Sequence, residues 1–254
     1  ANDLKLPALA VGKAGTPALL AAFNVKPATS KPDDIHHGLV PGKRAKQKAS
    51  LHTPVERIEL STQNIAAVLP GSGGGQRIVI GAHVDHLGLG TGSSLAPGQS
   101  AVHNGADDNA SGVATLLALA AAIARVPAAA RPYDLEFVAF GAEEMGLLGS
   151  KHYVGALSPE ARARIVAMLN FDMVGRLQGD AVVVSGVGTS SVWSPLLNRV
   201  AAPLQVRPSE DGFGASDQAS FYTAGLPVLH FFSGTHADYH KPSDDLDKIN
   251  FPGA

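Results

Sequence analysis

The sequence predicts an α/β fold, a three-layer α/β/α sandwich in which helices cover both faces of a central mixed, mostly parallel sheet. Three observations support this fold. Apolar runs of strand length alternate with segments of helical spacing along most of the chain. Several of these runs are continuously apolar, as expected for strands buried on both faces. Polar residues follow the runs directly, where ligands bind in open α/β sheets.

The predicted elements begin at residue 63 and follow one another closely. Two β-branched runs, 63–69 and 77–82, are separated by a proline and several glycines and therefore predict a hairpin. Apolar residues at helical spacing predict a helix that begins near Ser111 and ends before Pro127. The other expected elements are three buried strands and one helix, at 135–140, 165–170, 226–232 and 191–202.

Residues 1–54 differ from the rest of the chain and are predicted to form an N-terminal arm or linker. Residues 26–54 carry repeated Pro and Gly breaks and few large apolar side chains. A basic cluster lies within them, at Lys43, Arg44, Lys46 and Lys48. We interpret this cluster as a solvated loop rather than a nucleic-acid patch. Residues 55–254 are predicted to form the domain that carries the function.

Composition argues against several kinds of function. A formal net charge of −2 and a pI near 6.6 provide no broad basic field for nucleic acid or an anionic membrane surface. The absence of cysteine excludes disulfides, thiolate zinc sites and a cysteine nucleophile. No apolar run approaches about eighteen residues, so no membrane insertion is expected. The chain begins at Ala1 without a signal-peptide pattern and is expected to be a processed or trimmed form, of unknown oligomeric state.

Polar clusters stand at the predicted carboxyl ends of the buried strands and before the long helix. They are 83–86, 107–109, 143–144, 172 and 236–240. A charged group at the end of a buried strand costs free energy unless it is paired or binds a metal. Histidine and carboxylate without sulfur are the ligands of hydrolytic zinc, cobalt or manganese sites. The carboxylates exceed the need of one tetrahedral ion, whereas two metals about 3.5–4 Å apart would use the surplus.

Each cluster taken alone has a simpler interpretation. His83 would be a buried, hydrogen-bonded histidine, and His240 a surface one. The pairs 107–108 and 143–144 would lie at helix N-termini, where acidic side chains are favoured. Asp172 would be a turn residue at a strand end. Because all of them are expected at the same edge of the sheet, the metal site is the favoured interpretation.

The residues around these clusters resemble the two-zinc aminopeptidase family, metallopeptidases with an α/β core and co-catalytic zinc. The matching stretches are G-A-H-V-D-H at 81–86, G-A-D-D-N-A-S-G at 105–112, F-G-A-E-E-M-G-L-L-G-S at 140–150, N-F-D-M-V-G at 170–175 and D-Y-H-K-P-S-D-D at 238–245. The resemblance runs from about Gln63 to Asn250 in the family's order. It implies a sandwich of the zinc exopeptidase type, with residues 55–254 as the zinc peptidase catalytic domain.

The resemblance implies a set of metal ligands. They are His83 and Asp172 for one zinc ion, Glu144 and His240 for the other, and Asp108 as the bridge between the two. Asp107 is the alternative bridge, and the spacing to the A-S-G at 110–112 favours Asp108. The resemblance also implies that the peptide bond after Asp108 is cis.

Three further residues receive roles from the resemblance. Asp85 would fix the tautomer and orientation of His83. Glu143 would be the general base, because a carboxylate that binds no metal keeps its basicity. Tyr239 would stabilise the developing oxyanion together with one zinc ion.

An apolar pocket is expected to set the preference for the cleaved residue. Its candidate residues are Phe213, Phe221, Tyr222 and Gln218. Gln218 stands where relatives often carry His, a departure that bears on selectivity or rate. Residues 87–100 are more than ligation requires and are expected to form a rim loop. Neither a Gly-x-Ser-x-Gly elbow nor a phosphate-binding loop is found.

The function that the resemblance implies is a metal-dependent aminopeptidase, which hydrolyses N-terminal residues from peptides through a di-zinc-activated water. Cobalt or manganese are possible substitutes for the two zinc ions. Two alternatives stay open: a carboxypeptidase or glutaminyl cyclase on the same fold, and a non-catalytic binding module. The segment 6–11 resembles the closing segment of a protease-associated domain, which implies a secreted or periplasmic protein.

Overall fold

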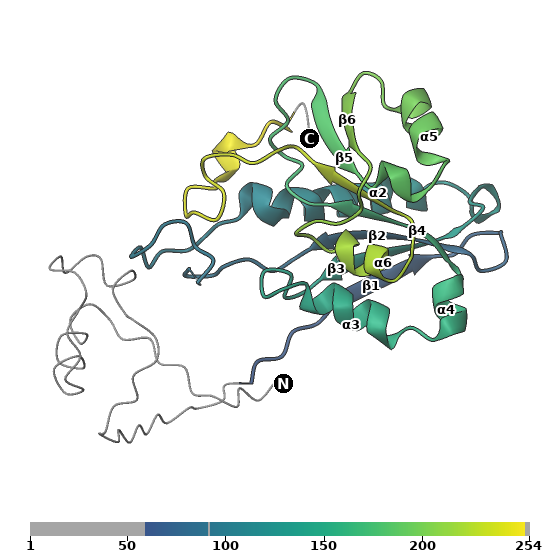
Figure 1. Cartoon of the computed structure of the whole chain (residues 1–254), viewed down its shortest axis with the longest axis horizontal. Helices are drawn as coiled ribbons and strands as arrows, with labels where there is room; N and C mark the ends of the chain where they lie inside the picture. The colour runs from purple at the N-terminus through teal and green to yellow at the C-terminus, as the bar shows by residue number, and fades with distance from the viewer. Residues whose placement is uncertain (1–58, 91, 252–254) are drawn as a thin grey trace, which may run out of the picture. The chain divides into compact units, whose positions relative to one another are not determined.

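The computed structural model describes residues 59–90 and 92–251, and all elements named below lie in the unit formed by Leu60–Ala254. The predicted arm at 1–54, its basic cluster and the segment 6–11 lie outside the described residues. Seven strands form one sheet flanked by helices (Figure 1). The strands are β1 Ile65–Leu69, β2 Arg77–His83, β3 Asp134–Phe140, β4 Ile165–Phe171, β5 Ala181–Ser185, β6 Gln205–Ser209 and β7 Val228–Phe232.

The structure confirms both predicted helices and adds α-helices that the sequence analysis did not predict. The α-helices are α2 Gly112–Ala124, α3 Leu148–Ala156, α4 Pro159–Ala163, α5 Trp193–Val200 and α6 Gln218–Thr223. α2 follows Ser111 and ends before Pro127, and α5 lies within the expected 191–202. Within the described residues, no helix combines the length and the apolar character needed to cross a membrane.

The sheet is mixed and mostly parallel, as predicted. The strand order is β1-β3-β2-β4-β7-β5-β6. The pairs β2/β3, β2/β4, β4/β7 and β5/β6 are parallel. The pairs β1/β3 and β5/β7 are antiparallel. The parallel centre places the carboxyl ends of β2, β3, β4 and β7 at one end of the sheet.

The predicted hairpin of 63–69 with 77–82 is wrong. β3 lies between β1 and β2, antiparallel to the first and parallel to the second. The link 70–76 has enough residues to pass beyond one strand, since neighbouring strands lie only about 4.8 Å apart. Hydrogen bonds hold the link to the start of β3 and to the segment before it, from Gly71 N to Asp134 Oδ1 at 2.7 Å and from Ser72 N to Arg131 O at 2.8 Å. The turn residues therefore make a crossover rather than a two-strand hairpin.

Side chains of the central strands alternate between two covered faces, which confirms the three-layer prediction. One face packs against α3 and α6 in a cluster that includes Val79, Val138, Met168, Val154 and Phe221. The other packs against α2 and α5 in clusters that include Ile80, Phe137, Leu116, Val184, Trp193 and Leu197. Both faces of the central strands are therefore buried, and the buried Glu136 inside β3 is paired with Arg77.

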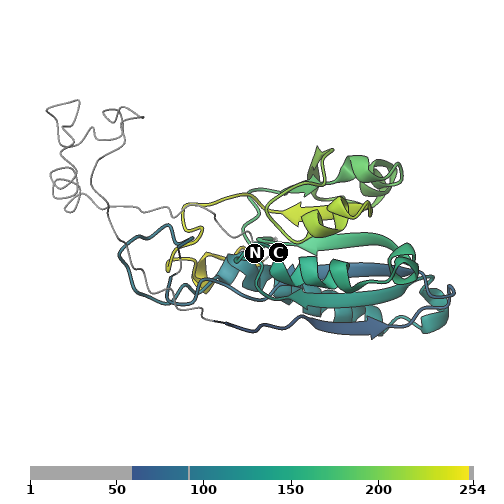
Figure 2. The same ribbon diagram turned by 60° about the horizontal axis from the view of Figure 1, so that its bottom comes forward.

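Two long segments meet at the carboxyl end of the central strands. The chain after β2 and the chain after β7 lie side by side in both views (Figures 1 and 2). A backbone hydrogen bond from Leu95 N to His240 O, 2.9 Å long, joins them. Asn104 Nδ2 adds a second link to Asp245 Oδ1 at 2.6 Å. The predicted rim loop 87–100 is thus attached to the segment that carries His240.

Candidate metal centre

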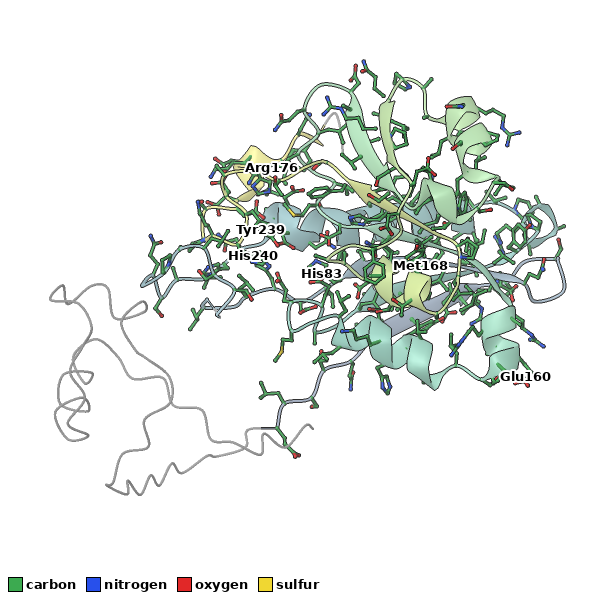
Figure 3. The ribbon with its side chains drawn as sticks, viewed as in Figure 1. His83, Glu160, Met168, Arg176, Tyr239 and His240 are labelled. Atoms are coloured by element: carbon green, nitrogen blue, oxygen red, sulfur yellow. The ribbon has the colours of Figure 1, made fainter. Side chains whose placement is uncertain are left out.

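The predicted metal ligands and catalytic residues lie together at one end of the sheet, where Figure 3 labels His83, Tyr239 and His240. His83 is the last residue of β2, and Asp172 follows β4 directly. The pair 143–144 follows β3 after a short turn, and His240 arrives from the segment after β7. All five predicted ligands and both predicted catalytic residues line one cavity of about 230 Å³. The geometry therefore unites the residues that the sequence placed far apart.

Asp108 reaches this cavity from the turn that precedes α2. Gly105 enters the turn with φ +61°, and a Cβ there would lie 2.3 Å from the carbonyl oxygen of Asp108. The Asp108–Asn109 peptide bond is cis, as the resemblance implies. Asn109 ties the turn to the end of β4, because its Nδ2 donates to Phe171 O at 3.0 Å and its Oδ1 accepts from Met173 N at 3.1 Å.

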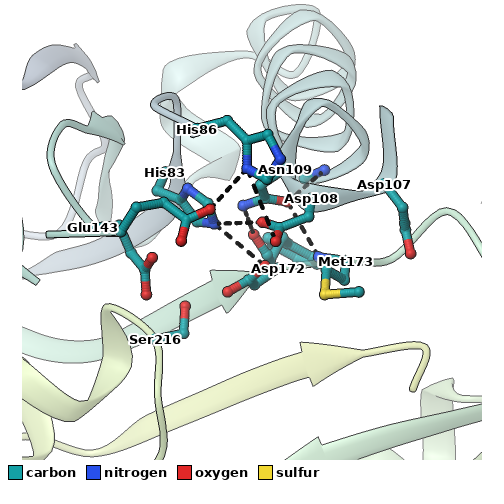
Figure 4. Close-up of polar contacts among 12 residues, drawn as sticks. His83, His86, Asp107, Asp108, Asn109, Glu143, Asp172, Met173 and Ser216 are labelled. Atoms are coloured by element: carbon teal, nitrogen blue, oxygen red, sulfur yellow. Dashed lines mark hydrogen bonds and ion pairs between the residues drawn. The ribbon is translucent and has the colours of Figure 1, made fainter. Parts of the chain in front are cut away.

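The first group of potential ligands centres on His83 (Figure 4). Its Nε2 lies 3.3 Å from Asp108 Oδ1 and 3.4 Å from Asp172 Oδ1. Zinc bonds of 2.0–2.1 Å in a tetrahedral site place neighbouring ligand atoms roughly 3.3 Å apart. His83 Nδ1 donates to the backbone oxygen of Asp85 at 3.1 Å, which leaves Nε2 as the nitrogen that faces the carboxylates. The spacing and the tautomer both suit a zinc ion.

The second group centres on His240. Its Nε2 lies 3.3 Å from Asp108 Oδ2 and 3.1 Å from Glu144 Oε2. Its Nδ1 donates to the backbone oxygen of Ser93 at 2.9 Å, so Nε2 again faces the carboxylates. Asp108 thus turns one oxygen toward each histidine, the arrangement expected of a carboxylate that bridges two cations.

The electrostatics of the two groups show where positive charge fits. Burial lowers the pKa of His83, but the facing carboxylates of Asp108 and Asp172 outweigh it and raise that pKa well above its ordinary value. Burial also lowers the pKa of His240, and Asp108 and Glu144 outweigh it and raise that pKa to about 10. Apart from the contact with His83, the buried Asp172 Oδ1 has no hydrogen-bond partner among the described residues. A buried oxygen of this kind is stabilised by a bound cation.

The carboxylate of Asp85 hydrogen-bonds to the backbone of Glu143 and Glu144 rather than to the imidazole of His83. Its Oδ1 lies 3.9 Å from His83 Nδ1, whereas its backbone oxygen lies at 3.1 Å. The carboxylate instead accepts the backbone N–H of Glu143 at 2.9 Å and of Glu144 at 3.3 Å. The residue predicted to orient His83 does so through its main chain, and its side chain fixes the segment that carries the predicted base.

Glu143 is a buried carboxyl group in the wall of the cavity. Burial is the largest cause that raises its pKa, to about 9. His83 opposes the shift, and the carboxylates of Asp172 and Asp217 add to it. A carboxyl group with this pKa holds its proton at neutral pH, and a nearby cation would favour its ionised form, the form that can accept a proton.

Tyr239 lies flat against His240, with ring centroids 3.9 Å apart and an interplanar angle of 24°. Burial and the carboxylates of Asp108 and Glu144 raise its pKa to about 12. Its hydroxyl therefore keeps its proton at neutral pH and can donate a hydrogen bond into the cavity.

Strained backbone is concentrated around the cavity. Ala142, Met173 and His240 have φ values of +54°, +52° and +54°, in the left-handed region that non-glycine residues avoid. Each such residue costs roughly 1–2 kcal/mol. Ala142 precedes Glu143, and Met173 follows Asp172. Strain of this kind persists where the surrounding structure fixes functional side chains.

The four predicted substrate-binding residues do not line the metal cavity. Phe221 is fully buried in the hydrophobic core under α6, and Tyr222 packs against the same cluster. Gln218 is buried, and its Oε1 accepts a hydrogen bond from Asn170 Nδ2 at 3.1 Å. Phe213 is 65% exposed and lines a separate cavity of about 380 Å³. The aromatic pattern in this stretch largely reflects the packing of α6 on the sheet.

Apolar side chains that the sequence did not single out form part of the cavity wall. They are Met173, Ala215 and Phe232. A larger cavity, of about 460 Å³, lies over the sheet beside α5. Its lining is apolar except for Thr115 and includes no titratable side chain. The smaller cavity is therefore the one that can perform acid–base or metal chemistry.

Sequence reasoning missed three polar residues near the site, of which His86 and Asp244 contact predicted ligands and Arg176 contacts Asp244. His86 Nδ1 lies 2.7 Å from Glu144 Oε1. Asp244 Oδ2 accepts the backbone N–H of Asp108 at 3.0 Å, and Arg176 Nη2 donates to Asp244 Oδ1 at 2.5 Å. His86 and Asp244 lie inside stretches that match the family, which was the available signal. Arg176 lies just after such a stretch, and nothing in the sequence pointed to it.

The fold and the site define an α/β protein with a cluster of histidine and carboxylate side chains that could hold metal ions, and the comparisons identify its family. Residues 64–254 match the sequence model of peptidase family M28, and the chain belongs to that family. It is 34% identical over 187 residues to leupeptin-inactivating enzyme 1 of Streptomyces exfoliatus, a match that covers 73% of this chain and 38% of that protein.

Solved structures of similar proteins share the fold. An aminopeptidase from Aneurinibacillus sp. strain AM-1 has a TM-score of 0.59 at 29% identity, covering 75% of this chain and 44% of that one. The zinc aminopeptidase BSAP of Bacillus subtilis has a TM-score of 0.58 at 28% identity, covering 73% and 45%. The chain thus spans less than half the length of these relatives.

Proposed function

We propose that the protein is a metal-dependent aminopeptidase that removes N-terminal residues from peptides with the help of two zinc ions. The observation that carries this proposal is Asp108, whose two oxygens each lie 3.3 Å from a different histidine, His83 or His240. The proposed ligands are His83 and Asp172 for one ion, Glu144 and His240 for the other, and Asp108 for both. When bound, two zinc ions would activate a water molecule and polarise the substrate carbonyl.

The chain's own residues would move the proton and stabilise the developing charge. Glu143 would accept a proton from the attacking water and deliver it to the leaving amine. Asp85 holds the backbone N–H of Glu143 at 2.9 Å, so the base would work from a fixed position. Tyr239 would donate a hydrogen bond to the carbonyl oxygen as negative charge develops there.

The charges of the cavity favour a substrate amine over a substrate carboxylate. Four carboxylates line it, from Asp108, Glu143, Glu144 and Asp172. Its described lining residues include no Lys or Arg. A carboxypeptidase needs a cationic side chain to hold the terminal carboxylate of its substrate, as Arg does in bidentate pairs. Because three of the four carboxylates are proposed metal ligands, it is the lack of a cationic side chain in this lining that favours an aminopeptidase over a carboxypeptidase.

The apolar part of the wall suggests which N-terminal residues are accepted. Met173, Ala215 and Phe232 provide an apolar surface beside the proposed metal ligands. Binding pockets of this kind combine apolar walls with a few polar groups that fix orientation. We therefore propose a preference for apolar residues such as leucine. The two alternatives are less favoured, since a cyclase that binds one zinc ion would not need Asp108 as a bridge and a binding module would not need Glu143.

The test compares leucyl-p-nitroanilide with its N-acetylated form and with a peptide blocked at the amino end, each with and without chelator. We expect hydrolysis of the free-amine substrate only, loss of activity with chelator and recovery with added zinc. Equal rates with and without chelator would contradict the metal mechanism, and release of residues from the blocked peptide would indicate a carboxypeptidase. The expectation of a secreted or periplasmic location stays a prediction.

A further inference from the structure

Glu144 lies between two histidines, one on each carboxylate oxygen. Its Oε2 faces His240 Nε2 at 3.1 Å, and its Oε1 faces His86 Nδ1 at 2.7 Å. Only His240 belongs to the proposed ligand set. His86 comes from the chain just after β2, and its side chain is about one-tenth exposed. The role of His86 is therefore a separate question from the ligand set itself.

Distances separate a metal ligand from a hydrogen-bond donor. Two ligands of one tetrahedral zinc ion should lie roughly 3.3 Å apart. The proposed ligand pairs lie 3.1–3.4 Å apart. His86, Asp108 and Glu144 lie close enough together to hold an ion, and His86 Nδ1 is 4.0 Å from Asp108 Oδ2. The 2.7 Å between His86 Nδ1 and Glu144 Oε1, however, is a hydrogen-bond distance and shorter than the spacing of two ligands of one zinc ion. His86 thus has the spacing of a donor to Glu144 and not of a fellow ligand.

We propose that His86 is a positioning residue of the metal centre, which donates Nδ1–H to Glu144 Oε1 and leaves Oε2 to bind the ion that His240 shares. The inference rests on the metal site of the proposed function. A donor on the outer oxygen of a ligating carboxylate fixes its rotamer and keeps it from chelating through both oxygens. It therefore raises the affinity of the site for its metal.

The surroundings of His86 hold the ring in the required orientation. A Cβ on Gly105 would lie 2.8 Å from His86 Cδ2, so only glycine leaves room for the ring beside the acidic turn. The rings of His240 and His103 pack near it, with centroids 5.9 and 6.3 Å away. Its Nε2 is buried without a hydrogen-bond partner in the part of the chain that the structure describes. Because Nδ1 faces a carboxylate oxygen, which can only accept, the proton belongs on Nδ1, as the donor role requires.

The test measures zinc binding directly, by titrating chelator-treated protein with zinc in competition with a fluorescent chelator. His86→Ala should weaken the binding of one of the two ions by about 10- to 100-fold and leave the other within about threefold. His86→Asn should bind within about threefold of wild type, because its amide nitrogen follows Cγ as Nδ1 does. His86→Gln places the donor one bond further from the backbone, so its zinc affinity should lie between those of His86→Ala and His86→Asn.

His103→Ala is the matched control. It removes a neighbouring buried imidazole whose Nδ1 donates to Ala101 O at 3.0 Å and whose Nε2 lies 2.8 Å from Ser94 Oγ. Its zinc affinities should stay within about threefold of wild type. Unfolding in urea with chelator present checks that each variant folds. If His86→Ala fails to fold, the comparison of His86→Asn with His86→Gln carries the test.

The outcomes separate the inference from the proposed function. If wild-type protein binds fewer than two zinc ions, the proposed function fails. If wild type binds two and His86→Ala binds both equally well, only the role of His86 is overturned. It is also overturned if His103→Ala weakens binding as much as His86→Ala, since the effect would then come from packing, or if His86→Asn is no better than His86→Ala.

Discussion

Asp244 accepts a hydrogen bond from the backbone N–H of Asp108 through its Oδ2, at 3.0 Å. The same oxygen accepts the N–H of Asp107 at 2.9 Å, and Oδ1 receives a hydrogen bond from Arg176 Nη2 at 2.5 Å. Asp244 is completely buried. The turn that presents the proposed bridging carboxylate is therefore anchored by a buried ion pair.

Replacing Asp244 should lower the unfolding free energy of the protein. Asp244→Ala leaves the Arg176 guanidinium without one carboxylate and two buried N–H groups without an acceptor, so we expect a loss of about 3–5 kcal/mol in unfolding free energy. Urea unfolding measures the change. Asp247→Ala, at an exposed position close by, should change it by less than about 0.5 kcal/mol. Equal losses of unfolding free energy in the two variants would contradict a stabilising role for the contacts of Asp244.

The proposed base can be separated from the proposed ligands. Glu143→Gln should lower kcat for leucyl-p-nitroanilide by about 100- to 10,000-fold, because the other carboxylates that line the cavity are proposed metal ligands. Zinc content and unfolding free energy should stay near wild type. Glu160→Gln, on exposed α4 away from the cavity (Figure 3), should keep full activity. A Glu143→Gln enzyme with wild-type kcat would remove this residue from the mechanism.

Metal-free protein should become less stable as the pH rises. Burial raises the pKa of Asp217 from 3.8 to about 7, opposed by the Ser150 hydroxyl. The folded state therefore binds more protons than the unfolded state between about pH 4 and 7, and stability falls across that window. In wild type this decrease in unfolding free energy should be on the order of 3 kcal/mol, and Asp217→Asn should not show it.

The measurement is urea unfolding in chelator at several pH values. The raised pKa values of Glu143, from 4.5 to about 9, and of His240, from 6.5 to about 10, lower stability in the same direction as the pH rises between those values. Both contributions should be the same in wild type and Asp217→Asn. Parallel curves for wild type and Asp217→Asn between pH 4 and 7 would contradict the prediction.

The two phenylalanines that the sequence suggested for substrate binding should behave differently. Phe221 is fully buried, so Phe221→Ala should cost about 3–5 kcal/mol of unfolding free energy. Phe213 is 65% exposed, so Phe213→Ala should cost less than about 0.5 kcal/mol. The KM of Phe213→Ala for leucyl-p-nitroanilide should stay within about twofold of wild type. A several-fold increase would instead place Phe213 in contact with substrate.

Sequence patterns predicted the fold where the physical cause was local. The continuous apolar runs at 135–140 and 165–170 became β3 and β4, because strands buried on both faces need apolar side chains throughout. The pairing of β1 was missed, because a turn signal reports that the chain reverses and not which strand it meets. Strand order depends on contacts between residues far apart in sequence.

The site could be predicted in part for the same reason. His83 and Asp172 stand at strand ends, and parallel strands bring such ends together. The contact of His86 with Glu144 and that of Arg176 with Asp244 depend on how loops pack, which no periodicity reports. The aromatic residues suggested for the substrate pocket do not line the metal cavity, and Phe221 and Tyr222 pack in the core, which uses the same residue types.

A crystal structure of the zinc-loaded protein, with anomalous scattering measured at the zinc edge, tests the two-metal site most directly. We expect two anomalous peaks about 3.5–4 Å apart, one beside His83 and Asp172, the other beside Glu144 and His240. Asp108 should contact both peaks, one through each oxygen. A single peak, or two peaks with Asp108 bound to only one of them, would contradict the proposed bridge and with it the two-zinc mechanism.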